Sequence, residues 1–208
     1  MRAEVPGPTV GKLVSRMSDT AKILYGIYLV LTLVAIALLL AGGMPLFDAC
    51  IHSFGSAGTG GFSCRNLSVG AYQNPYFDIV IGIFMLLFGV NFNLYYFLLI
   101  RRFRDVFHSE ELRSYLLIVT AAVVAITVDI AHLYDSVSTS LCHAFFQVSS
   151  IITTTGYASV DFDKWPEFSK CILLLLMFIG ACAGSTGGGI KVSRVMMAFK
   201  EARKEIGA

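Results

Sequence analysis

The stretch Ser53–Ser63, which reads SFGSAGTGGFS, places four glycines between two long apolar segments. Glycine is a poor helix former, so this stretch should end any helix that runs into it. Main chain without helical hydrogen bonds is tolerated at membrane depth only where protein buries it or where it lines a water-filled cavity. The fold therefore depends on whether the neighbouring segments cross a bilayer.

The composition is typical of a multi-pass membrane protein, since 56% of the 208 residues are hydrophobic and only 14% are charged. A bilayer is crossed by about 20 helical residues. Four segments have the necessary length and composition: Ile23–Ala41, Tyr76–Ile100, Tyr115–Leu133 and Phe168–Ile190. The sequence contains no catalytic constellation and no metal-ligand spacing, so we expect no enzyme, no cofactor and no nucleic-acid partner.

The basic residues divide unevenly between the two ends of these spans. Of the 16 lysines and arginines, all but Arg65, Lys164 and Lys170 lie before the first span, between the second and third, or after the fourth. The positive-inside rule then places both termini and the connection between the second and third spans in the cytoplasm. The expected parts are a cytoplasmic N-terminal segment (1–22), a first unit (23–100), a cytoplasmic linker (101–114), a second unit (115–195) and a cytoplasmic C-terminal segment (196–208).

Each expected unit contains an apolar segment too short to cross. Met44–Ser56 predicts a half-length helix of about 18 Å, and the chain returns through the glycines as an extended loop. The segment that begins at Asp135 and ends in Thr153–Tyr157 (TTTGY) repeats this order. A shift of 95 residues aligns Thr59 with Thr154 and Gly61 with Gly156. The sequence therefore predicts an all-α membrane protein with two tandem, parallel M1–pore-loop–M2 units.

Exposed carbonyl oxygens on such loops can replace the water around a cation, and the negative C-terminal end of each half-helix favours the same charge. The alternative is a simple buried loop between packed helices. The residues expected to form a selectivity filter are Gly58, Thr59, Gly60, Gly61, Phe62, Thr153, Thr154, Thr155, Gly156 and Tyr157.

A second glycine-rich segment interrupts the fourth span below the level of these loops. It predicts either a flexible intramembrane gating loop or a helix packed closely on its neighbours. The residues concerned are Gly180, Gly184, Ser185, Thr186, Gly187, Gly188, Gly189 and Lys191. Ile190 separates Gly189 from Lys191, so the segment fails the spacing of a nucleotide-binding P-loop.

Three motifs together resemble the Trk-type potassium uptake proteins of the Trk/Ktr/HKT superfamily: AGTGGFS (57–63), TTTGY (153–157) and GACAGSTGGGIKVSR (180–194). The resemblance implies potassium passage through a filter of four units, of which this chain holds what look like the second and third. It also implies a homodimer of complete chains in the cytoplasmic membrane, with a cytoplasmic nucleotide-binding regulatory subunit. Such a subunit could dock on the linker and on Phe199–Ile206.

Several alternatives remain at this point. The chain is either a fragment or one half of a parallel dimer that shares a pore. In the family, glycine in each loop is associated with potassium and serine in one unit with sodium; Gly61 and Gly156 favour potassium, with sodium and rubidium as further candidate ions. A sodium-permeable relative and a non-conducting scaffold or sensor are the rival functions.

For other polar residues near the spans, the sequence supports only less specific expectations. Asn91 and Asn93 either join helices or face the inner vestibule. Asp129 pairs with His132 or a hydroxyl, or has a functional role. The acids Asp161, Asp163 and Glu167 form an acidic outer mouth or a merely solvated loop.

Overall fold

The computed structural model describes residues 17–206, and helices are the regular structure of that part of the chain, apart from one isolated bridge between Ile179 and Ile190. The predicted all-α fold class is therefore confirmed. Two helices, Ala21–Ala41 and Glu110–Leu133, are long and apolar enough to cross a membrane, and a third span results if the bent pair described below counts as one.

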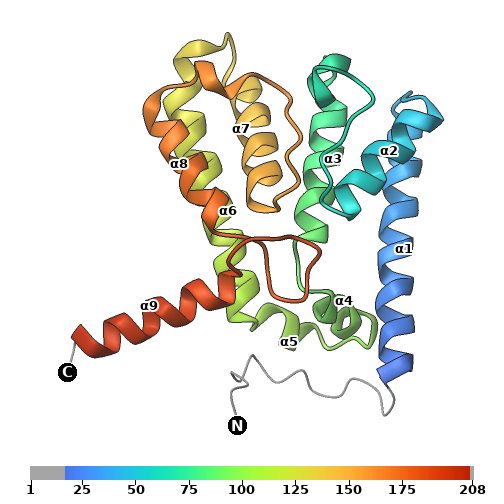
Figure 1. Cartoon of the computed structure of the whole chain (residues 1–208), viewed down its shortest axis with the longest axis vertical. Helices are drawn as coiled ribbons and strands as arrows, with labels where there is room; N and C mark the ends of the chain where they lie inside the picture. Colours follow the sequence, from blue (N-terminus) through green and yellow to red (C-terminus); the bar gives the residue numbers. More distant parts are fainter. Residues whose placement is uncertain (1–16, 207–208) are drawn as a thin grey trace.

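The first unit consists of a long helix, a half-length helix and a second longer helix (Figure 1). Helix α1 (Met17–Ala41) ends at a turn in which Gly43 has a φ of 89°. Helix α2 (Leu46–Ala57) then begins after Pro45, packs against α1 and stops at the glycine stretch. The chain returns through the 3-10 turn η1 (Ser68–Tyr72) to α3 (Pro75–Phe88).

The second unit repeats this order. Helix α6 (Glu110–Ile130) extends into the turn η2 (Ala131–Leu133) and is followed by the half-helix α7 (Val137–Ile152), which is capped by the Ser136 hydroxyl. The turn η3 (Phe162–Lys164) leads to α8 (Glu167–Phe178). At 16 residues, α7 is longer than the 12-residue α2.

The two units meet where α3 of the first packs along the half-helix α7 of the second (Figure 1). Each unit has its own apolar core, and the core of the first also contains Phe146 and Tyr157 from the second. The half-helices consequently end near each other, halfway down the bundle. This packing places the two predicted pore loops side by side.

The expectation of one continuous second span over Tyr76–Ile100 was wrong. The chain bends by 90° between α3 and α4 (Phe92–Leu99). The carbonyls freed at the end of α3 find other donors: Phe88 O accepts from the Thr186 amide (3.2 Å) and Gly89 O from the Cys182 amide (3.0 Å). A helix can break inside a membrane when a neighbouring segment satisfies its main chain in this way.

The fourth predicted span, Phe168–Ile190, is also not a single helix. Helix α8 ends at Phe178, residues 179–191 follow outside any helix, and α9 (Val192–Ile206) projects away from the bundle (Figure 1). The interruption is slightly wider than the predicted 180–189. The linker between the units contains a short helix of its own, α5 (Phe103–Phe107).

Candidate functional site

The two loops have the same backbone conformation at positions 95 residues apart. Thr59 and Thr154 have φ values of 50° and 59°, and Gly61 and Gly156 have φ values of 67° and 87°. These values lie in the left-handed region, which threonine rarely adopts. Two matched threonine–glycine pairs of this kind indicate that the repeat seen in the sequence is a repeat in structure.

The hydrogen bonds that end each half-helix follow the same register. The Gly60 amide donates to Gly55 O (2.7 Å), and the Thr155 amide donates to Ser150 O (2.9 Å). These bonds close each helix with a short turn, and the residues that follow lie outside any helix. Most carbonyls of the two loops have no main-chain donor within the described residues.

The two loops touch each other directly. A Cβ atom added at Gly61 would lie 2.0 Å from the Thr155 carbonyl oxygen, so only glycine fits there. The Tyr157 hydroxyl donates to Phe62 O (3.2 Å) across the gap between the units. Tyr157 is 1% exposed and Phe62 is 82% exposed, so the aligned aromatic residues have different surroundings.

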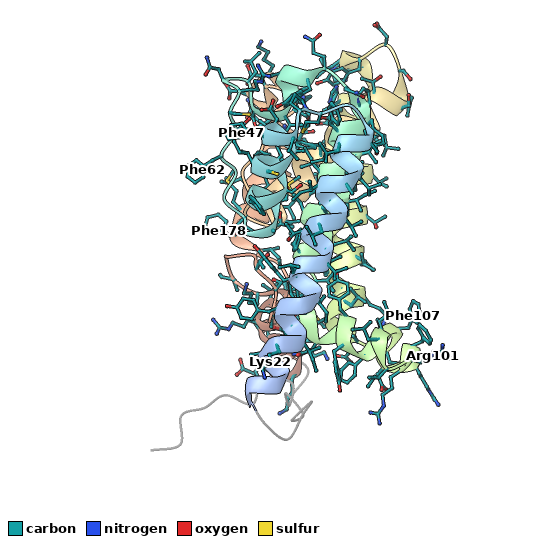
Figure 2. The ribbon with its side chains drawn as sticks, turned by 90° about the vertical axis from the view of Figure 1, so that its right-hand side faces the viewer. Lys22, Phe47, Phe62, Arg101, Phe107 and Phe178 are labelled. Carbon is teal, nitrogen blue, oxygen red and sulfur yellow. The ribbon has the colours of Figure 1, made fainter. Side chains whose placement is uncertain are left out.

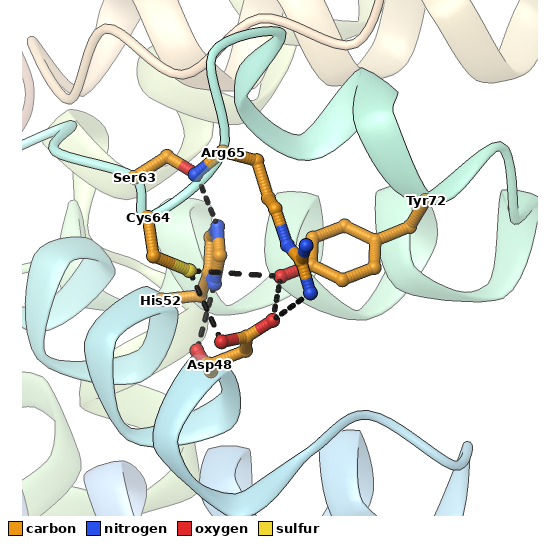
Figure 3. Close-up of polar contacts among 6 residues, drawn as sticks. All are labelled: Asp48, His52, Ser63, Cys64, Arg65 and Tyr72. Carbon is orange, nitrogen blue, oxygen red and sulfur yellow. Dashed lines mark hydrogen bonds and ion pairs between the residues drawn. The ribbon is translucent and has the colours of Figure 1, made fainter.

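A polar network behind the first loop connects the segment that follows this loop to α2 (Figure 3). The Asp48 carboxylate accepts from the Tyr72 hydroxyl (2.6 Å), from the Arg65 guanidinium (3.1 Å) and from the Cys64 thiol (3.1 Å). Burial raises the pKa of Tyr72 above its usual value, so the phenol keeps its proton and remains a donor. Sequence analysis missed this network, because the three donors lie 16 to 24 residues after Asp48 in the chain.

One residue on each half-helix also holds the returning chain. In the first unit the fully buried His52 ring bonds Asp48 O (2.7 Å) and the Ser63 hydroxyl (3.0 Å). At the aligned position of the second unit, Gln147 donates to Val160 O (3.1 Å). Different side chains thus provide equivalent support for the two loops.

The glycine-rich segment 179–191, which we call the crossing loop, lies against the predicted filter residues. The Gly188 amide donates to the Thr154 hydroxyl oxygen (2.7 Å), and the Thr59 hydroxyl donates to Thr186 O (3.4 Å). A Cβ at Gly187 would lie 3.1 Å from Thr153 O. The crossing loop therefore contacts both pore loops.

The base of the crossing loop is held closed by main-chain and side-chain contacts. The Gly180 amide donates to Ile190 O (2.7 Å), and the Lys191 ammonium donates to Gly187 O. The Ala183 amide donates to the Glu111 carboxylate (2.7 Å) at the start of α6. Sequence analysis missed Glu111, which looked like an ordinary first-turn acid.

The remaining polar residues have mostly structural partners. Asp129 accepts from the Ser169 hydroxyl (2.5 Å), which is the hydroxyl alternative expected above. The Asn91 side chain caps α4. Two of the acids predicted for an outer mouth, Asp161 and Glu167, form ion pairs with lysines of the same segment. No cluster of metal-binding side chains occurs among the residues that the structure describes.

Two helix–pore-loop–helix units with paired loops of exposed backbone define the class of pore-loop membrane proteins. The sequence model of the TrkH family, described as cation transport proteins, matches residues 2–208, and the chain belongs to this family. The resemblance drawn from the three motifs is thereby confirmed.

The chain is similar to potassium uptake proteins TrkH of two enteric bacteria. It is 41% identical over 209 positions to the protein of Salmonella typhimurium and 39% identical to that of Escherichia coli, in each case over 99% of this chain and 43% of the relative. It is also similar to the crystal structure of the potassium transporter TrkH from Vibrio parahaemolyticus, with a TM-score of 0.86 at 32% identity over 95% of this chain and 43% of that one. The chain thus spans less than half the length of the relatives it matches.

Proposed function

We propose that this chain supplies two of the four pore units of a potassium uptake protein in the bacterial cytoplasmic membrane. The observation that carries this proposal is the matched backbone of the two loops, in which Thr59 and Gly61 repeat at Thr154 and Gly156. Potassium sheds its water at carbonyl oxygens of residues 58–62 and 153–157. The chain acts by ion passage and not by catalysis.

Two further units are needed to complete the ring of carbonyls. Figure 2 shows Phe47, Phe62 and Phe178 along one side of the bundle, and their side chains are 70%, 82% and 62% exposed. An apolar face of this kind suits packing against other helices. The lengths of the relatives favour one longer polypeptide over a pair of half-length chains as the source of those units.

The crossing loop serves as the gate in this proposal. It lies next to the filter, and two threonine hydroxyls, of Thr59 and Thr154, hold it there. Five glycines between 180 and 189 permit the large changes of dihedral angle that a moving loop needs. Movement of this loop away from the pore loops opens the path to the cytoplasm.

The orientation follows from charge. Lys22 and Arg101 lie at the same end of the bundle in Figure 2, the end from which α9 also departs. We place this end, and both termini, in the cytoplasm. A cytoplasmic nucleotide-binding subunit docks there on the linker and on Phe199–Ile206, where Phe199 is 74% exposed. Complete chains pair as a homodimer.

The test is a chimera in which this chain replaces the matching segment of the Escherichia coli relative, expressed in cells that lack potassium uptake. Growth at low potassium that sodium cannot replace supports the proposal. Gly156→Ser in this chimera adds a hydroxyl group to the filter, which a methyl group does not, and should lower the preference for potassium over sodium. A folded chimera that conducts neither ion would favour a scaffold or sensor, and one that conducts both equally would favour a sodium-permeable relative.

A further inference from the structure

A cavity of about 570 Å³ lies between the N-terminal ends of α3 and α7, where the two units meet. Its lining includes Asp78, His143 and Ser159, together with the apolar side chains of Pro75, Ile79 and Val160. No residue assigned above to the filter or to the crossing loop lines it. Cavities of this volume accommodate small organic groups.

Three polar groups in this lining lack partners. Asp78 is 7% exposed, and its carboxylate makes no hydrogen bond or ion pair within the described residues. The His143 Nδ1 atom and the Ser159 hydroxyl are buried without hydrogen-bond partners there. Buried polar atoms are nearly always satisfied, so these two atoms, next to a carboxylate that has no donor within the described residues, indicate a ligand.

Two other acids with low exposure, the buried Asp48 and the half-buried Asp129, show how unusual Asp78 is. Asp48 has three donors, and Asp129 accepts from both the hydroxyl and the amide of Ser169. Asp78 lies in the first turn of α3, where the helix dipole favours a negative charge. The carboxylate is therefore suited to remain ionised if a cation faces it.

The lining specifies the chemistry of that cation. Neither lysine nor arginine lines the cavity, so its only formal charge is that of Asp78. A carboxylate, an imidazole nitrogen in its acceptor tautomer and a hydroxyl oxygen offer three acceptors. The volume and the apolar side chains leave room for carbon atoms next to the charge. We propose that this cavity binds a primary ammonium group, supplied by a phospholipid ethanolamine headgroup or by a free amine.

The test compares two lipids that differ only at nitrogen. Dioleoyl phosphatidylethanolamine carries N–H donors, and dioleoyl phosphatidylcholine carries three methyl groups in their place. Native mass spectrometry of the purified chain should show binding of the ethanolamine lipid at least about tenfold tighter, as expected for charge-assisted hydrogen bonds. Free ethanolamine in excess distinguishes the sources: displacement of the lipid indicates recognition of the amine alone, and retention indicates a lipid site.

Three variants test which residues produce the preference for the ethanolamine lipid. Asp78→Asn should abolish the preference between the two lipids, His143→Leu should reduce it about threefold, and Asp105→Asn, an exposed acid in the linker, should leave it unchanged. Equal binding of the two lipids by the unmodified chain would overturn the proposal, as would a preference retained by folded Asp78→Asn protein. If Asp78→Asn does not fold, the lipid comparison and His143→Leu still decide.

Discussion

The aligned glycines of the two loops should respond differently to the same substitution. Both have positive φ values, so alanine at either position costs about 1–2 kcal/mol of backbone strain. At Gly156 nothing lies within 4 Å of the added methyl group, and strain is the whole effect. At Gly61 the methyl group would lie 2.0 Å from the Thr155 carbonyl oxygen, and an ordinary contact needs at least 3.4 Å.

The difference follows from these distances. In Gly61→Ala, the Thr155 carbonyl or the first loop must move by roughly 1.4 Å, which displaces a proposed potassium ligand of the other unit. We therefore expect Gly156→Ala to retain its ion preference. Its equilibrium constant for the native loop conformation should fall about five- to thirtyfold, which is the factor that corresponds to 1–2 kcal/mol. Gly61→Ala should lose potassium preference as well.

The assay has two readouts. Thermal unfolding of the purified chain measures the strain, and uptake of potassium against sodium by the chimera measures the displacement. The ratio of the two uptake rates should fall in Gly61→Ala and hold in Gly156→Ala. Equal ratios in the two variants, with both proteins folded, would refute the inferred contact between the loops.

Three other substitutions test the support of the site. Thr154→Val removes the acceptor for the Gly188 amide but keeps the shape of the side chain. The closed position of the crossing loop then loses about 1 kcal/mol of stabilisation, which should raise rubidium uptake about fivefold. Thr154→Ser keeps the hydroxyl group and should leave rubidium uptake unchanged. Tyr72→Phe removes the 2.6 Å hydrogen bond to Asp48 and should lower the free energy of unfolding by about 1 kcal/mol, as thermal denaturation would record. Glu111→Ala leaves the Ala183 amide without its acceptor, which should make the crossing loop more sensitive to limited proteolysis than it is in Glu111→Gln.

Each of these has an outcome that contradicts it. Uptake that rises equally in Thr154→Val and Thr154→Ser would show that the hydroxyl does not hold the gate. An unfolding temperature unaffected by Tyr72→Phe would mean that Asp48 does not need the phenol. Cleavage of Glu111→Ala at the same rate as the unmodified chain would remove Glu111 from the support of the crossing loop.

The elements that could be predicted from sequence are those that local chemistry determines. The glycines of Ser53–Ser63 cannot continue a helix, and the 95-residue repeat marks the second loop without reference to the rest of the chain. The half-helix Met44–Ser56 was placed within two residues of α2 for the same reason. Gly61 and Gly156 have positive φ values, and the only sign of this in the sequence is that both residues are glycine.

The features that were missed depend on partners far away in sequence. The bend after Phe88 contains no proline, and it is stable because amides of the crossing loop, about 95 residues later, bond the freed carbonyls. Asp48, Arg65 and Tyr72 each look like surface residues until the fold brings them together. Sequence spacing carries no signal for contacts of this kind.

The central claim is that main-chain oxygens of the two loops surround a potassium ion stripped of water. Anomalous diffraction from crystals of the complete chimera soaked in rubidium tests it directly. The account predicts rubidium peaks within coordination distance of carbonyl oxygens from both 58–62 and 153–157. Peaks confined to the outer acids Asp161, Asp163 and Glu167, with none beside either loop, would contradict it.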